Sequence, residues 1–152
     1  LVDGSVEVWR GLWGGEYCGY HGEFFDFDRI VVSPKPSSEI PLYLGGAAPI
    51  ALRRTAREAQ GFIGAGNGPE QVPELLSRLA AMRAETDRAD EPIDTVMGVY
   101  GEPSVDLFRR LEDAGMTSGI HLPFWFAFDG PSSIDQKKAL MESFAENILR
   151  HF

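Results

Sequence analysis

Residues 40–68 read IPLYLGGAAPIALRRTAREAQGFIGAGNG, and this stretch decides the fold. A short apolar run at 40–44 leads into a Gly-Gly turn, then an amphipathic segment, then a second apolar run at Phe62-Ile63. The order strand, turn, helix, strand is typical of a βα unit. Pro49 favours a helix start, because proline fits the first helical turn, where a missing N–H costs nothing.

The same pattern repeats along the rest of the chain. Apolar runs at 62–63, 95–100 and 118–123 are each followed by a turn and an amphipathic stretch. Consecutive strand centres lie about 20 to 30 residues apart, which is enough for right-handed crossovers between parallel neighbours. We therefore predict an α/β fold with about four parallel βα units in residues 40–152. Such a sheet can be doubly wound, with helices on both faces, or part of a barrel with all helices outside.

Residues 1–39 precede these units and have a different character. Apolar residues recur at spacings of three and four from Val2 to Trp13, where Gly14-Gly15 ends the stripe. The segment from 20 to 32 mixes aromatic and acidic residues before a Pro-rich stop. We predict a helix, a short β-ribbon and a linker here.

Length, charge and cysteine content limit the possible functions. The 152 residues suffice for one core, so we expect a single domain over 1–152. The formal net charge of -9 repels phosphate backbones and anionic lipids, and we expect neither nucleic acid nor a membrane as partner.

Cys18 is the only cysteine, which is typical of a reducing compartment and predicts a cytoplasmic protein. No His/Asp/Glu triplet has metal-ligand spacing, so we predict no metal site.

Three phrases occur in a fixed order along the chain. They are YHGEFFDF at 20–27, IPLYLGG at 40–46 and AREAQGF at 56–62. They resemble the Y-x-G-x-x-(Y/F)-x-F ribbon, the P-I-x-x-G-G fifth strand and the A-R-x-x-D-G-(W/F) phrase of the luciferase-like monooxygenase superfamily. Gln60 stands where that family usually has Asp.

The resemblance implies a partial TIM (β/α)8 barrel, namely the C-terminal half of a luciferase-like barrel. It implies an oxidoreductase or monooxygenase that uses FMN or coenzyme F420 and a small-molecule substrate. Half a barrel leaves unpaired strand edges, so we expect a homo-oligomer that completes or covers it. The alternative is a non-catalytic half-barrel assembly module without cofactor, because strands one to four would carry much of the ring-binding site.

Two glycine-rich segments follow the first two predicted strands. Missing Cβ atoms let backbone N–H groups approach a phosphate, and a following helix start favours its charge. The alternatives are a tight turn that needs φ > 0 and a flexible linkage. We predict that the cofactor phosphate is bound by Gly45, Gly46 and Ala47 after the first strand and by Gly64, Ala65, Gly66 and Asn67 after the second.

His121 is the candidate catalytic residue. It lies near the carboxyl end of the fourth predicted strand, at the rim where barrel enzymes place catalytic groups. A neutral imidazole there can exchange a proton with a substrate or a flavin intermediate, although a packing histidine is the simpler interpretation. Glu102 and Asp129 are candidate rim acids, although carboxylates also gather at helix starts for structural reasons.

An aromatic cluster follows the last predicted strand. Four aromatic residues in five positions are too many for simple solvent exposure. We predict that they form an apolar wall for a substrate or flavin ring, or a packing surface within a barrel dimer. The cluster consists of Phe124, Trp125, Phe126 and Phe128.

Overall fold

The computed structural model describes residues 1–121, 124 and 127–152. The chain forms two compact units, Leu1–Pro41 and Leu42–Phe152. The boundary lies close to the predicted division between 1–39 and 40–152, and the single domain over 1–152 stays a prediction. Among the described residues, no helix is long and apolar enough to cross a membrane. The cytoplasmic location also stays a prediction.

The first unit contains the predicted helix and ribbon. Helix α1 (Val2–Trp13) buries Val6 and Val8. Strands β1 (Cys18–His21) and β2 (Asp26–Ile30) pair antiparallel. Aromatic side chains stabilise the ribbon, since the Tyr20 ring lies 6.4 Å from that of Phe27 across the two strands.

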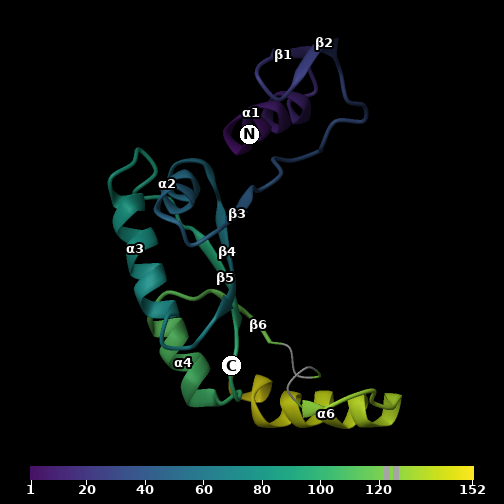
Figure 1. The fold of residues 1–152 in the computed structure, drawn as a ribbon, viewed down its shortest axis with the longest axis vertical. Coiled ribbons are helices and arrows are strands. Elements are labelled where there is room, and N and C mark those ends of the chain that lie inside the picture. The colour runs from purple at the N-terminus through teal and green to yellow at the C-terminus, as the bar shows by residue number, and fades with distance from the viewer. Residues whose placement is uncertain (122–123, 125–126) are drawn as a thin grey trace. The chain divides into compact units, whose positions relative to one another are not determined.

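The second unit is a four-stranded parallel sheet with the strand order β3-β4-β5-β6 (Figure 1). This confirms the predicted α/β class and its four parallel βα units. Sequential strand order is that of a barrel, whereas a doubly wound sheet changes direction at a switch point. The strands are β3 (Tyr43–Gly45), β4 (Gly61–Asn67), β5 (Asp94–Val99) and β6 (Ser118–Ile120); the helices are α2 (Pro49–Glu58), α3 (Val72–Ala84), α4 (Val105–Asp113) and α6 (Ile134–Asn147), with a short 3-10 turn at Leu149–His151.

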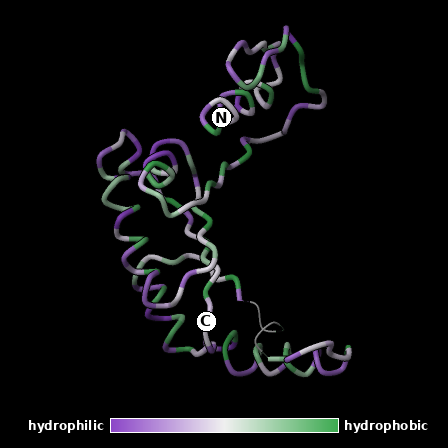
Figure 2. Tube along the Cα trace, in the orientation of Figure 1, coloured by the Kyte–Doolittle hydropathy of each residue, from purple (hydrophilic) through white to green (hydrophobic). Residues whose placement is uncertain are grey.

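Side chains alternate between the two faces of this sheet. Phe62, Thr95 and Met97 are buried and point toward the helices, and α2, α3 and α4 lie on that side (Figure 1). Figure 2 shows polar and apolar residues alternating along these helices, as expected where one helical face packs on a sheet. On the opposite face, Ile63 and Ile120 remain 42% and 47% exposed.

Hydrogen-bonding side chains set the starts of two helices. The Ser104 hydroxyl accepts a hydrogen bond from the Leu107 backbone N–H at the start of α4. Ser133 and Gln136 form a reciprocal capping box at the start of α6.

A buried arginine joins α2 to α3. Arg83 is 3% exposed, and its Nη1 donates to the backbone carbonyls of Ala56 and Ala59, each at 2.9 Å. These carbonyls lie at the end of α2, where helical backbone acceptors lack intrahelical partners. Burial lowers the pKa of Arg83, and the nearby Arg88 lowers it further.

Two predicted strand boundaries differ from the structure. The second strand continues through the glycine-rich segment to Asn67, with a register shift between Gly64 and Asn67. The Tyr100 backbone N–H donates to the Asn67 carbonyl at 3.0 Å, so neighbouring backbone continues the pairing past the glycines. The glycine-rich segment at 64–67, predicted to follow the second strand, is therefore the bulged end of β4. The fourth strand ends at Ile120, and Leu122 and Pro123 of its predicted range lie outside the described residues.

Candidate functional site at the carboxyl edge of the sheet

The turn between β3 and α2 brings backbone close to a helix start. A Cβ on Gly45 would lie 2.8 Å from the Ile63 carbonyl oxygen of β4, and Gly46 has a φ of +109°. Both positions therefore need glycine whether or not a ligand binds. Helix α2 begins without a side-chain cap and without an acidic residue in its first turn. The positive end of its dipole is therefore suited to an external anion such as a cofactor phosphate.

The second glycine-rich segment lies beside the first. Strands β3 and β4 are parallel, and Gly45 pairs in register with Ile63, which directly precedes Gly64. Gly66 has a φ of +74°, and a Cβ there would lie 3.4 Å from the Tyr100 ring. The structure thus brings both predicted phosphate-binding segments to one edge, with Ala65 and Asn67 in the end of β4 rather than in a loop.

His121 directly follows β6 and lies at the same carboxyl edge, because all four strands are parallel. Three strand spacings of about 4.8 Å separate β3 from β6, which corresponds to about 14 Å along the sheet. The His121 ring stacks on Phe144 of α6, with 5.6 Å between centroids and 10° between planes.

Burial sets the protonation state of His121. It lowers the pKa of the imidazole below 6.5, and a hydrogen bond with the Val99 backbone acts in the opposite direction. A histidine whose pKa lies below its usual value is neutral at pH 7. The ring therefore offers an uncharged, proton-exchanging group at this edge.

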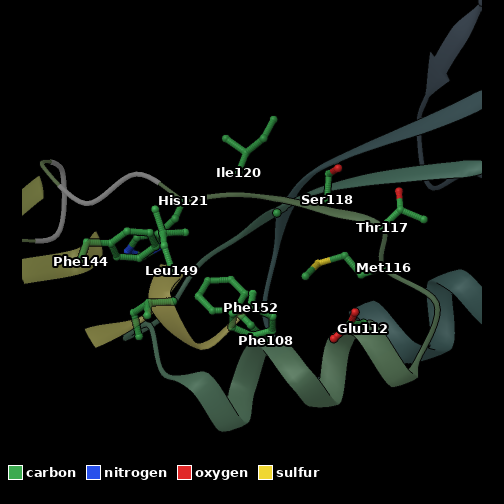
Figure 3. Close-up of a pocket in the computed structure, with 12 residues that line it drawn as sticks. Phe108, Glu112, Met116, Thr117, Ser118, Ile120, His121, Phe144, Leu149 and Phe152 are labelled. Carbon is green, nitrogen blue, oxygen red and sulfur yellow. The ribbon is translucent and has the colours of Figure 1, made fainter. Parts of the chain in front are cut away.

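Two cavities meet at His121. One of about 620 Å³ lies between the segment after β5, His121 and α6. The other, of about 540 Å³, lies between α4, β6 and the C-terminal segment; Figure 3 shows His121 and Phe144 at one end of it and Glu112 toward the other. Both volumes are in the range of small-molecule sites. The two cavities share His121, Phe144 and Ile148.

Sequence reasoning missed part of these walls. It placed the glycine segments, Glu102 and His121 at the carboxyl edge, but it did not assign Ser143, Phe144 and Asn147 to the cavity. Their spacing along α6 places them on one helical face. The spacing does not show which other element of the fold that face packs against.

Two other candidate features have a different outcome. Trp125 and Phe126 of the predicted aromatic wall lie outside the described residues. Asp129 does not line either of the two cavities among the residues that the structure describes. Within the described ranges, no group of three or more His, Cys, Asp or Glu side chains is arranged to hold a metal ion.

Comparisons with known proteins identify similar chains. A family model described as luciferase-like monooxygenase matches residues 2–116. A Mycobacterium tuberculosis protein described as uncharacterised is 34% identical over 97% of this chain and 51% of its own length. An F420-dependent glucose-6-phosphate dehydrogenase of Nakamurella multipartita is 29% identical over 78% of this chain and 35% of its own length. The chain thus spans about half the length, or less, of these curated relatives.

A solved structure shows the same fold. The coenzyme F420-dependent tetrahydromethanopterin reductase of Methanopyrus kandleri superposes with a TM-score of 0.77 at 16% sequence identity. The match covers 99% of this chain and 62% of the reductase. At this identity the likeness extends to the fold alone.

Proposed function

Because this chain belongs to the luciferase-like monooxygenase family, we propose that it acts as a flavin- or F420-dependent oxidoreductase on a small-molecule substrate. The cofactor is FMN or F420. The observation that carries this proposal is the uncapped start of α2, on the same sheet edge as His121 and its cavity.

In this proposal the cofactor phosphate lies at the turn from Gly45 to Ala48. The absence of side chains at Gly45 and Gly46 leaves the backbone accessible, and the dipole of α2 attracts the negative charge. Gly64, Ala65, Gly66 and Asn67 form the neighbouring part of this edge. When bound, the cofactor supplies the hydride or oxygen chemistry.

His121 has a separate role in this proposal. Its neutral imidazole accepts or returns a proton of the substrate, while stacking on Phe144 fixes the plane of the ring. The substrate-facing group and the phosphate site thus lie at opposite ends of the sheet edge, about 14 Å apart.

A fluorescence titration tests the cofactor proposal. We expect the chain to bind FMN or F420 saturably, and riboflavin, which lacks the phosphate, to bind at least tenfold more weakly than FMN if FMN is the cofactor. Ala47→Asp places a carboxylate beside the phosphate site and should weaken binding about tenfold or more by like-charge repulsion. Ala47→Asn has nearly the same size without the charge and is the matched control, which should retain most of the affinity. Equal loss in both variants, or no binding of either cofactor to the parent chain, would refute the proposal.

We also propose that a second copy covers the exposed part of the sheet. All three residues of the edge strand β6 are exposed, and Ile63 and Ile120 face away from the helices. This arrangement fits both the enzyme and the alternative, a cofactor-free assembly module. Light scattering after size-exclusion chromatography should give the mass of a dimer or larger oligomer. A folded monomer would contradict the pairing, and an oligomer that binds neither cofactor would favour the module.

A further inference from the structure

The cavity of about 620 Å³ next to His121 has few charged side chains in its lining. This is notable because one relative is described as a glucose-6-phosphate dehydrogenase, a name that implies a phosphorylated substrate for that relative. Among the described residues that line it there is no lysine and no arginine, and Glu102 is the one carboxylate. The four residues that the structure does not describe are Leu122, Pro123, Trp125 and Phe126, so none of them adds a cation. The adjoining cavity is similar, with Glu112 and no lysine or arginine among its described lining residues.

The remaining walls divide into an apolar and a polar part. Leu140, Phe144 and Ile148 present apolar surface from α6. Ser143 and Asn147 lie on the same helix and hydrogen-bond to each other, with Asn147 Nδ2 donating to Ser143 Oγ at 3.1 Å. An amide and a hydroxyl provide both donors and acceptors for an uncharged polar group.

This lining discriminates by charge. An anion that enters the cavity loses part of its hydration and finds no cation in the described lining to compensate. A cation finds a single carboxylate, and Glu102 is exposed, so solvent screens the attraction. An uncharged molecule with a hydroxyl or amide head and an apolar body meets neither penalty.

We propose that the cavity next to His121 is the substrate pocket and that it binds an uncharged amphiphilic molecule while excluding organic phosphates. The cavity's role as a substrate pocket depends on the proposed oxidoreductase function, whereas the charge selectivity depends only on the lining. Two lysines of α6, Lys137 and Lys138, precede Leu140, and neither is among the lining residues. Lys137 lies three residues before Leu140 and therefore on the same helical face.

Cyclohexanol and cyclohexyl phosphate form a matched pair of probes for this pocket. Amide chemical-shift titration of the 152-residue chain should show cyclohexanol shifting the signals of Ser143, Phe144 and Asn147. Cyclohexyl phosphate should bind at least tenfold more weakly at the same signals. Comparable affinity for both probes, or no shift at these signals with cyclohexanol, would overturn the proposal.

Charge variants test the cause of the selectivity. Glu102→Lys places a cation in the lining and should strengthen cyclohexyl phosphate binding about three- to tenfold, with little effect on cyclohexanol. Glu142→Lys makes the same charge change on an exposed part of α6 outside the lining and should change either affinity less than twofold. If the parent chain binds the phosphate and Lys137→Gln abolishes that binding, Lys137 serves the pocket and the exclusion of phosphates is wrong.

The outcome is independent of the cofactor titration. Cyclohexanol binding in a chain that binds neither FMN nor F420 would preserve the charge selectivity and refute the proposed oxidoreductase. Cofactor binding without probe selectivity would support the proposed oxidoreductase and refute the charge selectivity of the pocket.

Discussion

Replacement of Arg83 by methionine should strongly destabilise the second unit. Methionine retains most of the apolar stem, but it removes the Nη1 hydrogen bonds to the carbonyls of Ala56 and Ala59. A buried acceptor left without a partner costs about 1–3 kcal/mol. The Ala59 carbonyl keeps a hydrogen bond of 3.1 Å from Arg88 Nη1, so the Ala56 carbonyl is the one that loses its arginine donor. We therefore expect a loss of about 1–3 kcal/mol.

Urea denaturation followed by circular dichroism measures this loss. With an m value of about 2 kcal/mol per M, the midpoint should fall by about 0.5–1.5 M. Arg150→Met is the matched control, because Arg150 is exposed and pairs only at the surface with Glu146. It should change the free energy of unfolding by less than about 0.5 kcal/mol. If Arg83→Met also changed the free energy of unfolding by less than about 0.5 kcal/mol, the hydrogen bonds of Arg83 would not stabilise the end of α2.

Further predictions concern packing, capping and pH. Gly45→Ala should destabilise the chain by about 1–3 kcal/mol, because the new Cβ meets the Ile63 carbonyl, and an unchanged melting temperature would contradict the close approach. Ser133→Ala should cost about 1 kcal/mol through the lost cap of α6, whereas Ser133→Asp should retain most of the stability; equal stability of all three chains would argue against the capping box. Because the pKa of His121 is lowered in the folded chain, the unfolded chain binds more protons below pH 6.5, so the free energy of unfolding should fall as the pH drops from 6.5 toward that lowered pKa. His121→Gln should remove this part of the pH dependence, and an unaltered pH profile of stability in that variant would refute the burial of the imidazole.

The order of elements could be predicted because it depends on local pattern. Apolar runs and amphipathic stretches alternate along residues 40–152, and α2 begins at Pro49 as its sequence indicates. The cap at Ser104 likewise follows from a local hydrogen bond. The candidate positions of Gly45 and His121 at one edge follow from parallel strand order alone.

The remaining features depend on tertiary contacts. The segment at 64–67 looks like a loop in sequence, because glycine is depleted in strands, but backbone pairing with β5 and Tyr100 extends the strand through it. Arg83 lies in a helix where a charged residue usually indicates a solvent face, and only the packing of α3 on the end of α2 buries it. The cavity walls from α6 were missed for the same reason, since helical spacing does not identify the neighbour of a helix face.

A crystal structure of the chain with FMN or F420 bound would test the location of the cofactor most directly. We predict that a phosphate oxygen lies within hydrogen-bonding distance of backbone N–H groups between Gly46 and Ile50, at the start of α2. A cofactor whose phosphate lies away from the β3–α2 turn would contradict this site, even if the affinity were high.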